Sequence, residues 1–168
     1  MDALLTSRFH HRRAWRAFVA VVGVLALTSC VNLNVDGPSN GASQPSDPAA
    51  ETFNPNLNID LSKMQRTSSG VYYKDGPLGS GPALTGLGTV VVSFVGYLKT
   101  GAVFQSGTDV QIVLANEIVG LQEGMQGMHA GGERLLVIPS ALGFGALGAG
   151  AVPPNSTLVY DIIVKVIP

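Results

Sequence analysis

The last part of the chain, residues 131–168, constrains the fold most, because it contains two patterns typical of buried strands joined by one long loop. Residues 133–138 include four consecutive aliphatic side chains between two glycines and a proline, which is too short a run for a helix and favours a strand. Residues 157–167 alternate with period two, so that one face would be apolar and the other would carry Asp161 and Lys165. The predicted apolar face comprises Leu158, Tyr160, Ile162, Val164 and Val166.

The loop between these strands is rich in Gly and Ala and is closed by Pro153 and Pro154. Long loops in compact domains are usually functional, and a loop that only met solvent would be more polar. We therefore expect Leu142, Phe144 and Val152 to form the wall of a groove. The loop also matches G-x-G-x-x-G at residues 143–148, but the glycine and prolines that follow exclude the helix that a dinucleotide site needs.

The N-terminus has the pattern of an export signal. Four arginines precede an uncharged apolar run at residues 17–27, which is as long as a signal-peptide core and too short for a stable membrane span. The run ends in Leu27-Thr28-Ser29-Cys30, which resembles a bacterial lipobox. That resemblance implies cleavage of a signal peptide at residues 1–29, acylation of Cys30, and attachment to a bacterial membrane on the envelope or periplasmic side. The alternatives are a conventional signal peptide cut nearby or a buried free cysteine.

Residues 30–68 are predicted to tether the folded domain to that membrane. The first part is rich in Asn, Ser, Pro, Gly and Asp, contains spaced prolines and has no hydrophobic period. An alternative is that apolar residues in the second part dock loosely on the domain. These residues are Phe53, Leu57, Ile59 and Leu61.

The domain is predicted to occupy residues 69–168, and its pattern indicates an α+β fold. Short strands are expected at 71–74, 103–104 and 110–114, with a first long strand at 89–98. Asn116 is a plausible N-cap for a helix over about 117–126, and its apolar positions follow helical spacing. We therefore expect a small curled antiparallel sheet wrapped around one short helix.

Charge and composition exclude several classes of function. The formal net charge is −1, and removal of residues 1–29, which takes four of the ten basic and one of the eleven acidic residues, leaves −4. No nucleic-acid partner is expected from such a chain. The sequence contains one cysteine and three histidines, two of them in the signal segment, so we expect no metal site, no cofactor and no Ser-His or Cys-His catalytic pair.

The run GGERLLVIPSALGFG…AVPPNSTLVYDIIV closely resembles the C-terminal half of FKBP-type peptidyl-prolyl isomerases. Three upstream pieces, VVSFVGYL, GAVFQS and IVGLQEGMQGM, fit the same family in the same order. The resemblance covers about residues 69–168, and it implies an FKBP-like fold and prolyl cis/trans isomerisation. The expected partners are proline-containing segments of exported proteins, met by a monomer that is tethered through Cys30.

In this family, the matching positions line a shallow apolar pocket for the substrate proline ring, with Leu121 at its floor. The resemblance thus implies a substrate site formed by Phe94, Phe104, Gln105, Val110, Ile118, Val119, Leu121, Phe144, Val152 and Tyr160. Which of Ile118 and Val119 matches the family residue stays open, because the chain is shorter there. A backbone N–H of one of them would hold the neighbouring carbonyl.

Three positions depart from the family pattern. Phe94 and Phe144 stand where tyrosine is usual, and Gln105 stands where aspartate is usual. Losing a hydrogen bond typically costs about 1 kcal/mol. Three such losses together would lower turnover strongly. The alternative interpretation is therefore a domain that binds apolar peptides as a chaperone or scaffold, with little or no turnover.

Overall fold

The structure, a computed structural model, describes residues 45–168. The predicted signal peptide, Cys30 and the first part of the predicted tether lie outside these residues. The described chain forms β1 (Gln65–Arg66), β2 (Tyr72–Leu78), β3 (Thr89–Leu98), β4 (Val103–Val113), α1 (Val119–Gly124), β5 (Gly132–Ile138) and β6 (Leu158–Val166). Five 3-10 helices join them: η1 (Pro48–Ala50), η2 (Pro55–Leu57), η3 (Leu61–Lys63), η4 (Leu114–Asn116) and η5 (Ser140–Leu142). Within the same residues, no helix is long and apolar enough to cross a membrane.

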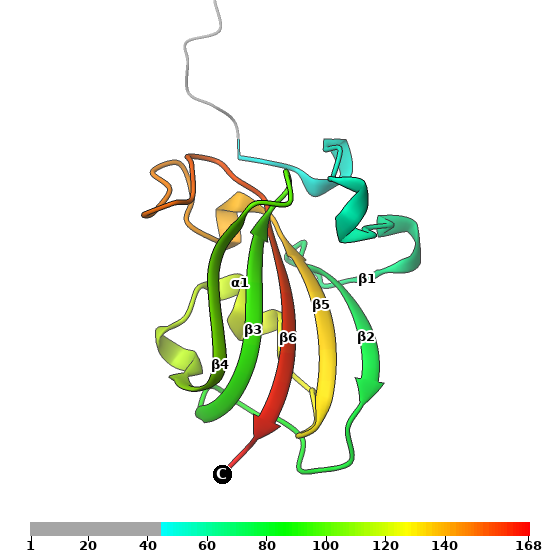
Figure 1. Ribbon diagram of the computed structural model, residues 1–168, viewed down its shortest axis with the longest axis vertical. Helices are drawn as coiled ribbons and strands as arrows, with labels where there is room; N and C mark the ends of the chain where they lie inside the picture. The colour runs from blue at the N-terminus through cyan, green and yellow to red at the C-terminus, as the bar shows by residue number, and fades with distance from the viewer. Residues whose placement is uncertain (1–44) are drawn as a thin grey trace, which may run out of the picture. The chain divides into compact units, whose positions relative to one another are not determined.

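The strands form one antiparallel sheet in the order β1-β2-β5-β6-β3-β4. The sheet curves, and α1 lies across one of its faces (Figure 1). The strands that were predicted at 133–138 and 157–167 become the neighbours β5 and β6, with Tyr160 opposite Leu136. On its other side β6 pairs with β3, where Tyr160 faces Gly96. This arrangement confirms the predicted α+β fold, a curled antiparallel sheet around one short helix.

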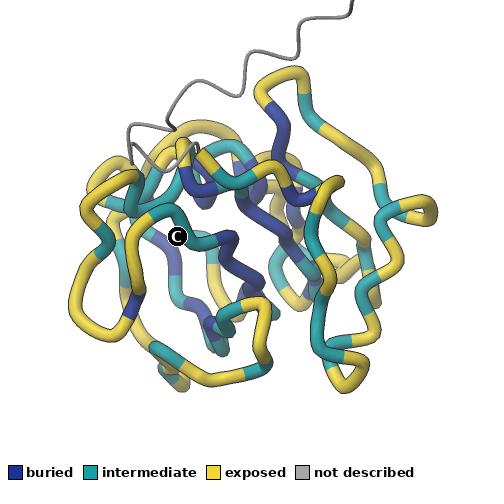
Figure 2. The backbone as a smooth tube through the Cα atoms, turned by 90° about the horizontal axis from the view of Figure 1, so that it is seen from above, coloured by how far each residue is buried: buried dark blue, intermediate teal, exposed yellow. Residues whose placement is uncertain are grey.

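The core lies between the sheet and α1. Side chains alternate along each strand, so one face of β3, β5 and β6 is apolar and buried while the other carries more exposed residues. The buried residues gather inside the fold, and the exposed ones follow the loops and edges (Figure 2). The largest fully buried side chains include Leu114, Met125, Leu136, Ile138 and Leu158.

Helix α1 is shorter than predicted and starts differently. It runs from Val119 to Gly124, and its N-cap Ile118 makes no side-chain capping bond. The predicted N-cap, Asn116, ends η4 instead. The predicted apolar face is confirmed, because Leu121 and Met125 are buried. A short uncapped helix is stable here because it packs on the sheet, as isolated helices of this length are not stable in water.

Strand β4 is one continuous strand rather than the two short strands that were predicted. It stays paired with β3 from Val113 to Val103 by means of two bulges. At one bulge Phe104 is the extra residue between the pairs Gly96–Gln105 and Tyr97–Val103. The other bulge includes Asp109, whose φ is +50°. Bulges re-aim side chains, and they leave no simple period in the sequence.

The described part of the predicted tether packs on the domain. The Ser46 and Ser140 backbone N–H groups each donate to the other residue's Oγ, at 2.8 and 2.9 Å, and the Thr157 hydroxyl donates to Ser46 Oγ at 2.8 Å. Further along, the Asn54 N–H donates to the carbonyl oxygen of Lys99 at 2.8 Å. Phe53, Leu57, Ile59 and Leu61 are all half-buried. The part of the segment that the structure describes therefore contacts the domain through these hydrogen bonds.

Candidate functional site

A small apolar cavity of about 80 Å³ lies between α1 and the face of the sheet that carries the core. Strands β3, β4 and β6 form its walls. Leu121 of α1 and the flanking residues Glu117 and Met125 close it. Its lining residues are Val92, Phe94, Gln105, Val110, Ile112, Glu117, Leu121, Met125, Tyr160 and Ile162. We call this space the apolar cavity.

Four aromatic rings connect the cavity to the long Gly/Ala loop. Tyr160 is buried, and its ring centroid lies 6.1 Å from that of Phe94 and 5.5 Å from that of Phe104. The Phe104 ring in turn meets Phe144 edge-on at 6.4 Å. Such tilted and edge-to-face pairs add about 0.5–1.5 kcal/mol each beyond the area they bury. The rings therefore form a fixed wall that runs from β3 to the loop.

Gly96 allows this aromatic packing. A Cβ atom at Gly96 would lie 2.7 Å from Phe104 Cζ and 3.1 Å from Tyr160 Cε1, so any larger side chain would displace one of the two rings. The bulge at Phe104 aims its ring across the glycine. Gly96 is itself buried in the middle of β3. A glycine in a strand interior often marks such a close approach, and here it fixes the position of the ring.

The cavity holds one acidic group and one phenol. Burial raises the pKa of the Tyr160 hydroxyl well above its usual range, and the negative charge of Glu117 raises it further. Tyr160 is therefore neutral at all physiological pH values. Its hydroxyl contributes a polar atom to the cavity but no charge.

The structure brings together half of the predicted site residues in the cavity lining. Phe94, Gln105, Val110, Leu121 and Tyr160 line it directly. Phe104 and Phe144 lie beside it in the aromatic wall.

Ile118, Val119 and Val152 do not line the cavity. Ile118 is half-buried against the core, Val119 is 47% exposed, and Val152 is buried in the core. The first N–H groups of a helix have no intrahelical acceptors, so the turn at Ile118 and Val119 still offers donors next to the cavity.

Five lining residues were not predicted. Val92 and Ile162 share the face of Phe94 and Tyr160 on their strands, and Ile112 shares the face of Val110, so the period of two was the signal that could have found them. Met125 lies one helical turn after Leu121. Glu117 gives no such signal, because an acidic residue before a helix is usually read as a solvated first-turn residue.

The site has the chemistry of an apolar enclosure with a polar edge. Its walls are aliphatic and aromatic, and the Gln105 amide and the Glu117 carboxylate supply the polar edge. In residues 45–168 there is no group of three or more His, Cys, Asp or Glu side chains placed to hold a metal ion. Such a cavity can hold an apolar ring and exclude water from it.

Comparison with known proteins places this chain beside a family of isomerases. The model of the FKBP-type peptidyl-prolyl cis-trans isomerase family matches residues 82–165. A probable FKBP-type peptidyl-prolyl cis-trans isomerase of Haemophilus influenzae is 41% identical over 104 residues, which are 59% of this chain and 43% of the relative. An FK506-binding protein of Neisseria meningitidis is 39% identical over 80 residues, covering 44% of this chain and 73% of the relative.

Solved structures agree with this. The crystal structure of FkpA from Escherichia coli matches with a TM-score of 0.59 at 34% identity, over 62% of this chain and 51% of that one. A peptidyl-prolyl cis-trans isomerase from Pseudomonas syringae matches with a TM-score of 0.59 at 31% identity, over 62% of this chain and 80% of that one. The match to the Haemophilus influenzae relative spans less than half of that protein's length.

Proposed function

This chain belongs to the FKBP-type peptidyl-prolyl cis-trans isomerase family, and on that basis we propose that it catalyses cis/trans isomerisation of X-Pro bonds in polypeptides. The observation that carries the proposal is the apolar cavity, which adjoins a continuous aromatic wall and is lined by Phe94, Leu121 and Tyr160. The cavity receives the proline ring, and the peptide runs along its edge. A single copy of the chain contains the whole cavity.

The reaction needs no acid, base or nucleophile. Rotation about the X-Pro bond is slow because amide resonance must be lost, with a barrier of about 18–20 kcal/mol. The planar amide is charge-separated, so water stabilises it more than it stabilises the twisted amide. A dry cavity removes that advantage and fits the twisted form, and each 1.4 kcal/mol or so of this difference accelerates rotation about tenfold.

Truncation of Phe94 tests whether catalysis occurs in this cavity. Phe94→Ala removes part of the wall and admits water, and burial of such a ring is worth about 1.5–3 kcal/mol. We expect kcat/KM for a short X-Pro peptide to fall about 10- to 100-fold. The matched control is Phe53→Ala, which truncates a half-buried phenylalanine of the N-terminal segment and should leave the rate unchanged. Equal losses in both variants would place catalysis elsewhere.

A second candidate function is a binding module that grips apolar peptides without turnover. Two polar groups that the family usually supplies are absent, because phenylalanine occupies positions 94 and 144. Phe144→Tyr separates the two functions. If the chain is only a binding module, its peptide affinity stays in place in this variant while turnover rises from the uncatalysed rate.

We further propose that the protein is exported and lipid-anchored at Cys30, where it meets newly exported polypeptides. The proposal is supported by the basic start, the apolar run and the Leu27-Thr28-Ser29-Cys30 sequence. Two or more acyl chains hold a protein stably on a bilayer, whereas one chain binds marginally.

Substitution of Cys30 tests the anchor. Cys30→Ala removes the thiol that would be acylated, so we expect the chain to move from the membrane fraction to the soluble fraction after expression in a bacterial host. Mass spectrometry should find acyl chains on Cys30 of the unchanged protein. An unmodified Cys30 in a mature protein would refute the anchor and leave the isomerase proposal intact.

A further inference from the structure

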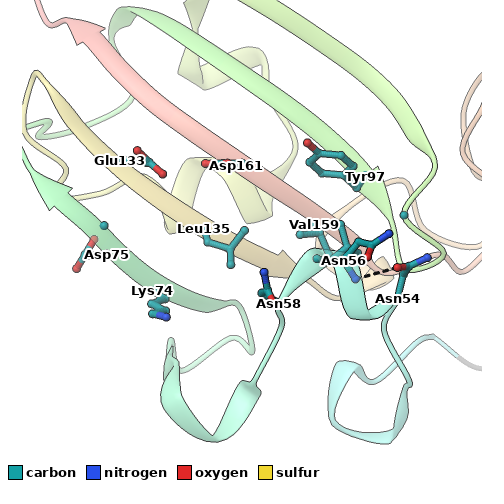
Figure 3. A pocket seen from close by; sticks show the side chains of 13 residues that line it. Asn54, Asn56, Asn58, Lys74, Asp75, Tyr97, Glu133, Leu135, Val159 and Asp161 are labelled. Carbon is teal, nitrogen blue, oxygen red and sulfur yellow. Dashed lines mark hydrogen bonds between the residues drawn. The ribbon is translucent and has the colours of Figure 1, made fainter.

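A second cleft lies on the face of the sheet opposite the core, away from the apolar cavity. It has a volume of about 600 Å³, and it opens between the sheet and residues 54–58 of the N-terminal segment (Figure 3). This volume is within the usual range of ligand sites, about 300–1,000 Å³. Strand alternation separates the two sites, because Tyr160 points into the core while its neighbours Val159 and Asp161 line this cleft. We call it the outer cleft.

The N-terminal segment is held in place over the cleft by two hydrogen bonds and one ion pair to the β3–β4 turn. The Asn54 N–H donates to the Lys99 carbonyl at 2.8 Å, and Asn54 Nδ2 donates to the Thr100 carbonyl at 2.7 Å. Lys99 Nζ also pairs with Glu51 at 3.0 Å. The wall of the cleft is therefore an ordered part of the domain.

The outer cleft has an apolar base and two polar ends. Its base is formed by Leu57, Tyr97, Leu135 and Val159. Asn54 and Asn56 lie at one end, and Asn58, from the same N-terminal segment, lies nearer Leu135 and Lys74 (Figure 3). The carboxylates of Glu133 and Asp161 lie at the other end, on the neighbouring strands β5 and β6 (Figure 3).

These two carboxylates face the cleft without a cationic partner among residues 45–168. The ion pairs within 4.0 Å in that part of the chain join other residues, and Asp75, which also lines the cleft, is paired with Arg134 at 2.6 Å. Lys74 is the basic residue of the lining, and it lies beyond 4.0 Å from all three acids. Burial raises the pKa of Asp161, and the charge of Glu133 raises it further. The cleft therefore carries negative charge that a bound cation would relieve.

We propose that the outer cleft binds an arginine or lysine side chain of a partner polypeptide. The aliphatic stem of the side chain lies on the partly exposed Leu135 and Tyr97, and its cationic group lies between Glu133 and Asp161. The Asn54 amide is engaged with Thr100 and with the Asn56 N–H, so the amides of Asn56 and Asn58 are the ones that pair with the peptide backbone. Long basic side chains commonly bury the stem on apolar surface in this way while the charged group stays at a polar site. This inference goes beyond isomerisation, since it uses the opposite face of the sheet and needs no proline.

The test measures the binding of a blocked, proline-free peptide with two arginines to the full chain. Calorimetry gives the affinity, and changes in amide chemical shifts locate the bound peptide. A matched peptide carries citrulline, which has the same shape without the charge, in place of each arginine. We expect the arginine peptide to bind at least tenfold more tightly and to shift the amides of Tyr97, Leu135 and Val159. Equal affinity for the two peptides, no binding, or shifts centred on the apolar cavity would each overturn the proposal.

Variants that remove one carboxylate charge test where the cationic group binds. We expect Asp161→Asn to weaken the arginine peptide about fivefold, which is the size of one partly exposed ion pair, and Glu133→Gln to have a similar effect. The matched control is Asp109→Asn, which removes the same charge at the β3–β4 bulge outside the cleft and should change affinity less than twofold. If all three variants weaken binding equally, the attraction is a long-range effect of net charge and the outer cleft is not the site. Glu133 and Asp161 do not line the apolar cavity, so the isomerase assay is independent of this test. Either result leaves the proposed function standing.

Discussion

Arg134→Ala should lower the free energy of unfolding by about 2–3 kcal/mol, because it removes a partly buried ion pair and leaves two backbone carbonyl oxygens near the end of α1 without their donor. The Arg134 side chain is 9% exposed, and its Nε lies 2.6 Å from Asp75 Oδ1. The same guanidinium donates to the carbonyl oxygens of Gly124 and Gln126 at the end of α1, and it stacks over the Tyr73 ring. One side chain thus joins β2, β5 and the end of the helix. Urea denaturation followed by circular dichroism measures the loss.

Two comparisons make the Arg134 prediction specific. Arg66→Ala removes an exposed arginine that stacks on Tyr72, and it should cost less than about 1 kcal/mol. Removing both partners, as in Arg134→Met with Asp75→Leu, should cost less than Arg134→Ala alone, because no carboxylate is left without its partner and the apolar side chains keep part of the packing. A loss below 1 kcal/mol for Arg134→Ala would show that this pair does not hold the helix to the sheet.

Gly120→Ala should destabilise the domain by about 3 kcal/mol, although alanine normally stabilises a helix by about 1 kcal/mol relative to glycine. A Cβ atom at Gly120 would lie 2.2 Å from Ile138 Cγ2, and both residues are buried. Ile138 is β-branched and sits in the middle of the core, so it cannot turn away freely. The helix would have to move off β5, which is the cost of overpacking. Thermal unfolding of the two proteins gives the difference.

A second glycine provides the control for this prediction. Gly88→Ala makes the same chemical change where no atom lies within 4 Å of the new Cβ, so stability should change by less than about 0.5 kcal/mol. In a double-mutant cycle, Gly120→Ala should cost less when Ile138 is already alanine. If Gly120→Ala stabilises the protein, then α1 does not pack as closely on β5 as the structure has it.

The sequence predicted the strands better than the helix. Strand β3 has the predicted bounds, because Val90, Val92, Phe94 and Leu98 recur with period two along Thr89–Leu98. The continuity of β4 could not be predicted, since its two bulges interrupt the period at Phe104 and Asp109. The helix is short because Gly120 and Gly124 are there for contact with β5 rather than for helix formation, and this contact is tertiary.

The site residues that could be predicted are those whose positions follow from alternation along a strand or from the family resemblance. Phe94, Leu121 and Tyr160 line the cavity as expected. The ring of Phe104 reaches Tyr160 because of a bulge and a facing glycine, and neither relation is visible in one sequence. The outer cleft was not foreseen at all, because it needs residues 54–58 to pack on the sheet, and their composition resembles a linker.

The rate of cis/trans isomerisation of a short X-Pro peptide with the full chain tests the central claim most directly. An apolar cavity that excludes water and fits the twisted amide predicts acceleration above the uncatalysed rate, saturation with peptide, and loss of both in Phe94→Ala but not in Phe53→Ala. A folded chain that binds the peptide and leaves its isomerisation rate unchanged would contradict this account. The domain would then be a peptide-binding module with the fold of an isomerase.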